Sequence, residues 1–277
     1  MKTLAGAIEI VRKAAVIGLD FQRHGAYTSR SSKPDGTVVT QADRQIEALL
    51  CSELDRAFPG CNFVAEELPH PFIRDSEFTF IIDPIDGTDS FSNGMPTWSI
   101  SVGLFDAQLR PIGGIVFAPG LDLLLFADVD GQAYQGSTKL ERVTLTSELT
   151  ESSSIFVSSR IHRQLDLRDY PGKTRSWGSC AVNLVTPAVY PGVIGAVQDS
   201  SAHAWDIAGA HAILASLGCE VRYLNGKAVD YGNMGVQEWK VEDFLVAGKP
   251  GAVDLLTKLI RRLEPQRLEE VRDTHPV

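Results

Sequence analysis

The sequence predicts a layered protein of α+β and α/β character, because its two halves alternate strands and helices in different ways. Between residues 98 and 134, apolar or alternating runs separated by Gly and Pro turns are typical of an antiparallel meander. From residue 155 onward, short strands interleave with helical segments, which indicates an α/β unit. Before residue 60, apolar residues recur at helical spacing and predict amphipathic helices.

Two helices and an intervening loop are expected first. One helix carries apolar residues from Leu4 to Phe21 on one face, and we expect it to serve packing. Residues 29–36 form a polar loop with Lys33 at its tip, and this lysine is either a solvated cation or a group near a site. The second helix opens at Thr40, which would cap it, and Asp43 would reach back to the Thr40 amide.

Short runs rich in β-branched and aromatic residues predict the strands, and longer periodic runs predict the later helices. The predicted strands are 60–65, 78–82, 98–105, 111–117, 122–128, 131–134, 140–145, 155–157, 193–198, 219–224 and 244–247. The helices predicted in the second half are 179–189, 205–217 and 252–263.

A polar stretch rich in Ser, Thr and Glu, residues 146–154, is the best candidate for a boundary between two parts. We expect an N-terminal α+β part over residues 1–147, with the antiparallel sheet. A C-terminal α/β part would follow over residues 148–265, and the charged residues 266–277 would be a flexible tail.

Composition narrows the class of function. The chain of 277 residues is 44% hydrophobic and 22% charged, as in ordinary soluble proteins that bury a substantial interior. Its 26 basic and 35 acidic residues give a net charge of -9, which argues against binding a nucleic-acid polymer. The four cysteines form no C-x-x-C pair, so they are expected to be core residues in a reducing compartment. No run reaches membrane length, and we expect a cytoplasmic protein with no membrane partner.

The segment 82–88 is the place where chemistry is expected. Asp83 and Asp86 follow an apolar strand, Pro84 cannot donate to a sheet ladder and should end the pairing, and Gly87 permits a tight turn. Two carboxylates held this close are costly in a partly buried place unless a cation lies between them, and Mg²⁺ prefers such oxygen ligands. The alternative is a plain turn, since Asp, Pro and Gly are common turn residues.

Three motifs, in order along the chain, resemble those of the inositol monophosphatase superfamily of Mg²⁺-dependent, lithium-sensitive phosphatases. That family carries an acidic pair, then D-P-(I/L)-D-G-T, then W-D-x-A-G, which here are Glu66-Glu67, residues 83–88 and residues 205–209. The resemblance runs from about residue 36 to residue 248. It implies an αβαβα layered sandwich, Mg²⁺ as cofactor, and a homodimer.

The resemblance also implies roles for particular residues. The metal ligands would be Glu66, Asp83, the Ile85 carbonyl, Asp86 and Asp206, and the catalytic residues would be Asp43, Thr88 and Glu66. Thr88, paired with Asp43, would orient and deprotonate an attacking water. The substrate would contact Gly87, Thr88, Gly178, Ser179, Ala181, Asp199 and Asp206.

Several of these residues have simpler explanations. Asp43 could be a capping residue only, Asp206 an N-cap aspartate of the helix that Gly218 closes, and Asp199 a turn aspartate before Ser200.

A helix start near residues 178–181 could hold sugar hydroxyls or phosphate through its amides.

The function expected is Mg²⁺-dependent hydrolysis of a small phosphorylated polyol, with inositol monophosphate preferred. Asp89-Ser90-Phe91 replaces the Thr-Asn-Phe common in the resembled family, which leaves 3′(2′),5′-bisphosphate nucleotidase, histidinol phosphatase and fructose-1,6-bisphosphatase activities open. A phosphosugar-binding regulator without turnover is the alternative of a different class, and the presence of both Asp43 and Thr88 argues against it.

Overall fold

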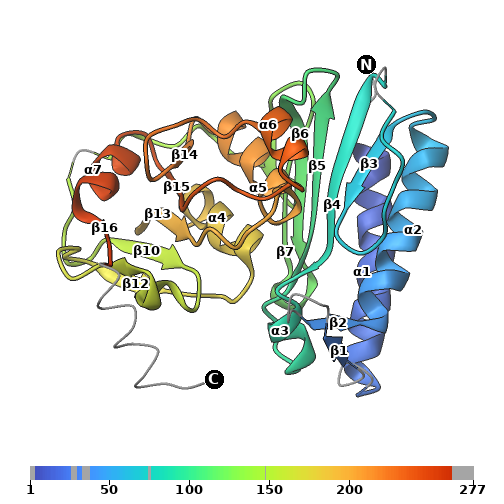
Figure 1. Ribbon diagram of the computed structural model, residues 1–277, viewed down its shortest axis with the longest axis horizontal. Coiled ribbons are helices and arrows are strands. Elements are labelled where there is room, and N and C mark those ends of the chain that lie inside the picture. Colours follow the sequence, from blue (N-terminus) through green and yellow to red (C-terminus); the bar gives the residue numbers. More distant parts are fainter. Residues whose placement is uncertain (1–3, 26–29, 33–37, 74–75, 147, 264–277) are drawn as a thin grey trace.

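The protein is built in five layers, α, β, α, β and α, as Figure 1 shows. This computed structural model describes residues 1–277 except 1–3, 26–29, 33–37, 74–75, 147 and 264–277. Lys33, most of its predicted loop and the predicted tail lie outside the described residues. The layered sandwich expected from the sequence is confirmed.

The first sheet has seven strands in the order β3-β4-β5-β6-β7-β8-β9. Only β3 and β4 are parallel neighbours; the other pairs are antiparallel, as expected of a meander. The strands are β3 (Asn62–Ala65), β4 (Phe78–Asp86), β5 (Ser99–Asp106), β6 (Pro111–Ala118), β7 (Leu123–Ala127), β8 (Ala133–Gln135) and β9 (Thr138–Lys139).

Two long helices, α1 (Ala5–Arg23) and α2 (Gln41–Ala57), cover one face of this sheet. Their buried residues, such as Ile46 and Leu50, share a core with Phe80 and Ile82 of β4. The short hairpin of β1 (Arg30–Ser32) and β2 (Val38–Thr40) leads into α2.

The second sheet has five strands in the order β12-β10-β13-β15-β14. Between the two sheets lie α4 (Cys180–Val189) and α5 (Ala204–Ser216), while α7 (Ala252–Leu259) packs on the outer face of the second sheet. The remaining elements are β10 (Ser154–Val157), β11 (Leu165–Asp166), β12 (Lys173–Arg175), β13 (Val193–Gln198), β14 (Glu220–Tyr223), α6 (Tyr231–Val236), β15 (Leu245–Gly248), β16 (Arg261–Arg262) and the short 3₁₀ turns Pro119–Leu121 and Ile161–Arg163.

The structure corrects four expectations about elements. Pairing does not end at Pro84: β4 continues to Asp86, because the residue without an N–H falls within a register irregularity between Asp83 and Asp86. Residues 140–145 form no strand. The last helix ends at Leu259, where the chain turns extended to pair β16 with β11. The short helices α3 (Thr88–Ser92) and α6 were not expected.

The predicted boundary at residues 146–154 falls between β9 of the first sheet and β10 of the second. The division of the chain at residue 147 stays a prediction. Among the described helices, none combines the length and the apolar character that crossing a membrane requires.

A candidate metal centre between the two sheets

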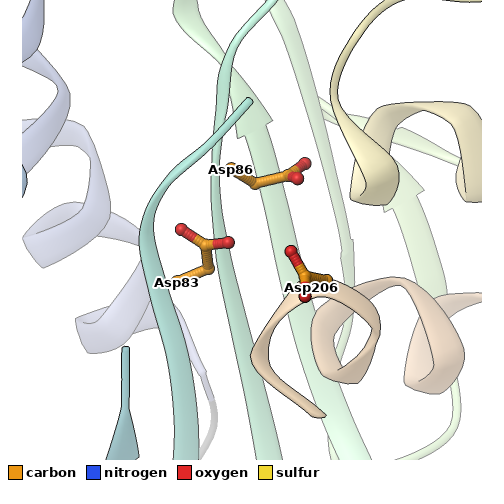
Figure 2. A group of neighbouring side chains, drawn as sticks. All are labelled: Asp83, Asp86 and Asp206. Atoms are coloured by element: carbon orange, nitrogen blue, oxygen red, sulfur yellow. The ribbon is translucent and has the colours of Figure 1, made fainter. Parts of the chain in front are cut away.

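Three aspartates converge at the point where the first sheet meets α5. One carboxylate oxygen from each of Asp83, Asp86 and Asp206 lies within 4.8 Å of the others. Figure 2 shows that Asp83 and Asp86 come from β4 and that Asp206 faces them from α5. The positions of Asp83 and Asp86 therefore depend on the course of one strand, β4.

The irregularity in β4 places both of its aspartates on the same side. Asp83 pairs with Ser101 of β5 and Asp86 pairs with Ser99, so two intervening residues of β4 lie opposite one residue of β5. The Ile85 amide donates to Asp83 Oδ1 at 3.0 Å, which fixes that carboxylate. Gly87 then turns the chain with a φ of 88°, and a Cβ there would lie only 2.9 Å from the Gly178 carbonyl oxygen.

Asp86 is held by a network of donors. The amides of Cys180 and Ala181, at the start of α4, donate to its two oxygens at 2.9 and 2.8 Å. The Ser99 hydroxyl donates at 3.1 Å, and the Ser179 hydroxyl donates as well. A carboxylate at a helix N-terminus is stabilised by the exposed amides and the helix dipole.

Asp206 lies in the first turn of α5. His203 is the N-cap residue and its amide donates to Asp206 Oδ2 at 2.6 Å. Asp206 is therefore the third residue of the helix, and the alternative explanation of Asp206 as the N-cap residue is wrong. The carboxylate therefore caps the N-terminus from inside the helix.

The electrostatics of the cluster favour a bound cation. Burial raises the pKa of Asp83 well above its usual range, and the neighbouring charges of Glu66, Asp86 and Asp206 raise it further. Burial, then Asp86 and Glu66, likewise raises the pKa of Asp206. The pKa of Asp86 is raised by burial despite its hydrogen bonds. Buried hard oxygen donors that repel one another in this way are a fitting donor set for a divalent cation.

Thr88 and Asp43 meet beside this cluster. The Thr88 hydroxyl lies 3.4 Å from Asp43 Oδ1 and 3.0 Å from the Ile85 carbonyl oxygen, and it can donate to either acceptor. Asp43 is fully buried in the first turn of α2. The structure thus places Thr88 beside Asp43, its predicted partner, and beside the Ile85 carbonyl; the roles of these residues stay predictions.

Glu66 and Asp199 are not among the three clustered aspartates. Glu66 follows β3 and is not one of the three clustered ligands, but its charge is the largest Coulombic cause of the raised pKa of Asp83. Asp199 follows β13 and accepts a hydrogen bond from the Ser201 amide at 2.9 Å, as a turn aspartate does. Its charge also raises the pKa of Asp206.

The sequence reasoning missed two serines in the site. Ser99 donates to Asp86, and the Ser101 hydroxyl donates to the Trp205 carbonyl oxygen at 3.1 Å, one residue before Asp206. Both serines are fully buried in β5. Two hydroxyls at alternate positions of an apolar strand point to one face, and that spacing was a usable signal.

A cavity of about 880 Å³ adjoins the centre. Glu66 and Trp205 belong to its lining, whereas the three aspartates do not. Phe72 and Trp239 form part of its wall with ring centroids 6.3 Å apart. The cavity therefore lies beside the three aspartates and not around them.

Comparisons with known proteins agree with this geometry. A family model described as "Inositol monophosphatase family" matches residues 1–261. An inositol-1-monophosphatase of Mesorhizobium japonicum is 28% identical over 71% of this chain and 76% of its own length. A histidinol-phosphatase of Chlorobaculum parvum is 30% identical over 76% of this chain and 82% of its own. The crystal structure of the extragenic suppressor protein SuhB from Bartonella henselae superposes with a TM-score of 0.75, at 22% identity, over 91% of this chain and 95% of its own.

The fold, the acidic site and these relatives together define a metal-dependent phosphatase of small phosphorylated substrates. The chain belongs to the inositol monophosphatase family.

Proposed function

We propose that the protein hydrolyses a small phosphorylated polyol with the help of Mg²⁺, and that inositol monophosphate is its preferred substrate. The observation that carries the proposal is the convergence of Asp83, Asp86 and Asp206 beside the Thr88–Asp43 pair. The inositol-1-monophosphatase relative supports the polyol substrate.

Asp83, Asp86 and Asp206 would hold Mg²⁺, with Glu66 and the Ile85 carbonyl completing the ligands. Bound Mg²⁺ supplies a Lewis acid for the phosphoryl oxygens and a lowered pKa for a coordinated water. The Thr88 hydroxyl would orient an attacking water, and the Asp43 carboxylate, which lies 3.4 Å from the hydroxyl oxygen, would accept the proton. Asp43 lies in the first turn of α2 and Thr88 is the first residue of α3, so each group has a fixed place in a helix.

The substrate contacts are proposed at Gly87, Thr88, Gly178, Ser179, Ala181, Asp199 and Asp206. The Ser179 hydroxyl and the Ala181 amide already donate to Asp86. We therefore propose that these two residues act on the substrate mainly by orienting Asp86. Asp199, at the end of β13, remains the group that would accept hydrogen bonds from the hydroxyls of the leaving group.

Histidinol phosphate is the second candidate substrate, and the adjoining cavity favours it. Glu66, Glu67 and Glu238 line the cavity together with aromatic rings, whereas no lysine or arginine is among the described residues that line it. Carboxylates and aromatic faces are suited to a protonated amine. The histidinol-phosphatase relative, at 30% identity, agrees with this alternative.

A phosphate-release assay tests the proposal. Purified protein with saturating Mg²⁺ would be given inositol 1-phosphate, histidinol phosphate, adenosine 3′,5′-bisphosphate and fructose 1,6-bisphosphate, with EDTA as the control. We expect the highest kcat/KM for inositol 1-phosphate and no turnover in EDTA. A higher value for histidinol phosphate would select the second candidate, and turnover of none of the four would contradict both.

Lithium sensitivity, a homodimer and a cytoplasmic location complete the proposal; the first two rest on the family, and the third rests on the sequence. Sedimentation equilibrium would test the dimer, because a homodimer has twice the 30.1 kDa mass of the chain. An unchanged rate of turnover at millimolar lithium would contradict the sensitivity to lithium.

A further inference from the structure

Glu47 is a fully buried carboxylate that the proposed reaction does not use. It lies in α2 and accepts two backbone hydrogen bonds, one on each oxygen. The Glu67 amide donates to Oε2 at 2.8 Å and the Leu68 amide donates to Oε1 at 2.7 Å. These are the two amides that directly follow Glu66.

A carboxylate in this position is costly, because burial disfavours its charge. Burial raises the pKa of Glu47 to about 7, and the two amide donors oppose that rise. His70 Nε2 lies 3.7 Å from Oε1, and burial lowers the pKa of His70, which disfavours its charged form. The two amides are thus the main partners of the carboxylate, and they belong to a segment that folds back on α2.

The position of Glu47 on α2 connects this contact with the reaction. Asp43 and Glu47 are four residues apart, so they lie on the same face of the helix, one turn from each other. Asp43 contacts the Thr88 hydroxyl, and Glu47 binds the chain beside Glu66. One helix, α2, therefore contacts both Thr88 and the segment that begins with Glu66.

We propose that Glu47 is a positioning residue, which holds residues 66–68 against α2 so that the Glu66 carboxylate stays beside Asp83. This inference rests on the proposed role of Glu66 as a metal ligand. Residues 66–68 are not part of a helix or strand, so they depend on such contacts for a fixed position.

The experiment is a double-mutant cycle on Mg²⁺ affinity, measured by isothermal titration calorimetry. Glu47→Gln replaces one accepting oxygen by an NH₂ group that faces a donor, and Glu66→Gln removes the ligand itself. We expect Glu47→Gln to weaken Mg²⁺ binding about tenfold, which is typical when a residue that orients a ligand is lost. In the double variant, affinity should fall no further than in Glu66→Gln alone, because both changes act through one ligand.

Two controls separate positioning from stability. Glu53→Gln changes a carboxylate of the same helix that pairs with Arg56 at the surface, and it should leave Mg²⁺ affinity unchanged. Circular dichroism would establish that each variant is folded before titration. If Glu47→Gln does not fold, Glu47→Asp replaces it, since the shorter side chain keeps the charge but cannot reach both amides.

The outcomes are distinct. If Glu66→Gln weakens Mg²⁺ binding while folded Glu47→Gln binds within twofold of the wild type, the inference is overturned and the proposed site stands. Losses in the two single variants that add up in the double variant would also overturn it. If Glu66→Gln binds Mg²⁺ as the wild type does, the assignment of Glu66 as a ligand fails, and the inference fails with it.

Discussion

Asp83 is a buried carboxylate that lies among other acidic groups. It is 1% exposed, and its pKa is raised first by burial and then by the charges of Glu66, Asp86 and Asp206. Without a cation this arrangement opposes folding, whereas with a cation the same charges bind it. Function and stability of the metal-free protein therefore depend on this residue in opposite ways.

Asp83→Asn should abolish turnover and stabilise the metal-free protein. The amide keeps an oxygen that can accept from the Ile85 amide, but it removes one charge from the cluster. Because the substitution relieves repulsion within a buried acidic cluster, we expect the variant to unfold at a higher urea concentration than the wild type in EDTA. Urea unfolding and phosphate release measure the two effects, with the exposed Asp55→Asn as control. Activity within tenfold of the wild type would contradict the role of Asp83 as a ligand.

Asp199→Ala tests the proposed recognition of a polyol. If Asp199 accepts hydrogen bonds from ring hydroxyls, KM for inositol 1-phosphate should rise roughly tenfold or more, the typical worth of a charged hydrogen bond. The rate with an aryl phosphate should hardly change. An equal loss of kcat/KM with both substrates would indicate that Asp199 supports the metal site. No loss with either substrate would mean that Asp199 is only a turn residue, which accepts a hydrogen bond from the Ser201 amide.

The helix α5 determines where Asp206 lies, and small residues let it approach the first sheet closely. A Cβ added at Gly209 would lie 2.7 Å from the Ile115 carbonyl oxygen, and one added at Gly103 would lie 2.7 Å from Ala208 Cβ. A Cβ at Gly114 of β6 would overlap the Gly209 carbonyl oxygen. Only small side chains, such as those of Ala208 and Ala212, lie between the helix and these glycines among the described contacts, so the close approach of the two backbones sets the depth of Asp206.

Gly114→Ala should therefore displace α5. Overpacking of this kind costs about 1 to 3 kcal/mol, and a shift of Asp206 should also weaken Mg²⁺ binding. Chemical denaturation and calorimetric titration would measure both effects. Gly192→Ala is the matched control, since an added Cβ there has no neighbour within 4 Å among the described atoms. If Gly114→Ala had the stability and the Mg²⁺ affinity of the wild type, the close contact between Gly114 and Gly209 would not determine the position of Asp206.

His211, also in α5, makes stability depend on pH. Burial lowers its pKa from 6.5 to about 4, and its Nδ1 lies 3.1 Å from the Tyr231 hydroxyl. Below pH 6.5 the imidazole of His211 binds a proton in the unfolded chain but not in the folded chain. The contribution of neutral His211 to the free energy of unfolding is therefore fully present above pH 6.5 and is lost as the pH falls towards 4. Between pH 7.5 and 5 the loss should be about 2 kcal/mol. In His211→Gln, urea denaturation should show that this loss between pH 7.5 and pH 5 has disappeared. The same loss in His211→Gln as in the wild type would contradict the prediction.

The site joins the two halves of the chain. Asp83 and Asp86 belong to the first sheet, whereas Asp206 and the amides that bind Asp86 belong to helices of the second half. These helices, α4 and α5, form the middle layer and share one core with residues of both sheets, including Phe105 and Val116 of the first and Ala196 of the second. The two halves should accordingly unfold together.

Scanning calorimetry should show one transition, which Mg²⁺ moves to higher temperature as a whole. A ligand at 100 times its Kd stabilises by about 2.7 kcal/mol, and for a chain of this size that corresponds to a rise in Tm of roughly 5 to 10 °C. Asp206→Asn should greatly reduce the rise. Two separate transitions, of which only one responds to Mg²⁺, would contradict the coupling of the halves.

Local patterns in the sequence were enough to predict the two long N-terminal helices, most strands of both sheets and the acidic corner at residues 83–86. These features depend on periodicity and on turn residues, which act between neighbours in the chain. The family resemblance also indicated Asp43, Thr88 and Asp206, although these residues lie far apart in the sequence. What such patterns could not predict was the irregularity that lets β4 continue past Pro84, since pairing with β5 decides it.

Only the tertiary structure decided how the site is supported. Ser99, Ser179 and the Cys180 amide reach Asp86 because β5 and the start of α4 come together there, and no short-range pattern specifies that meeting. Glu47 can be buried in the folded protein because two backbone amides of a distant segment, those of Glu67 and Leu68, donate hydrogen bonds to its carboxylate. The sequence by itself determined which groups can bind a cation and which segments are helical or extended. Packing determined their distances, because a contact between remote segments depends on how all the layers fit.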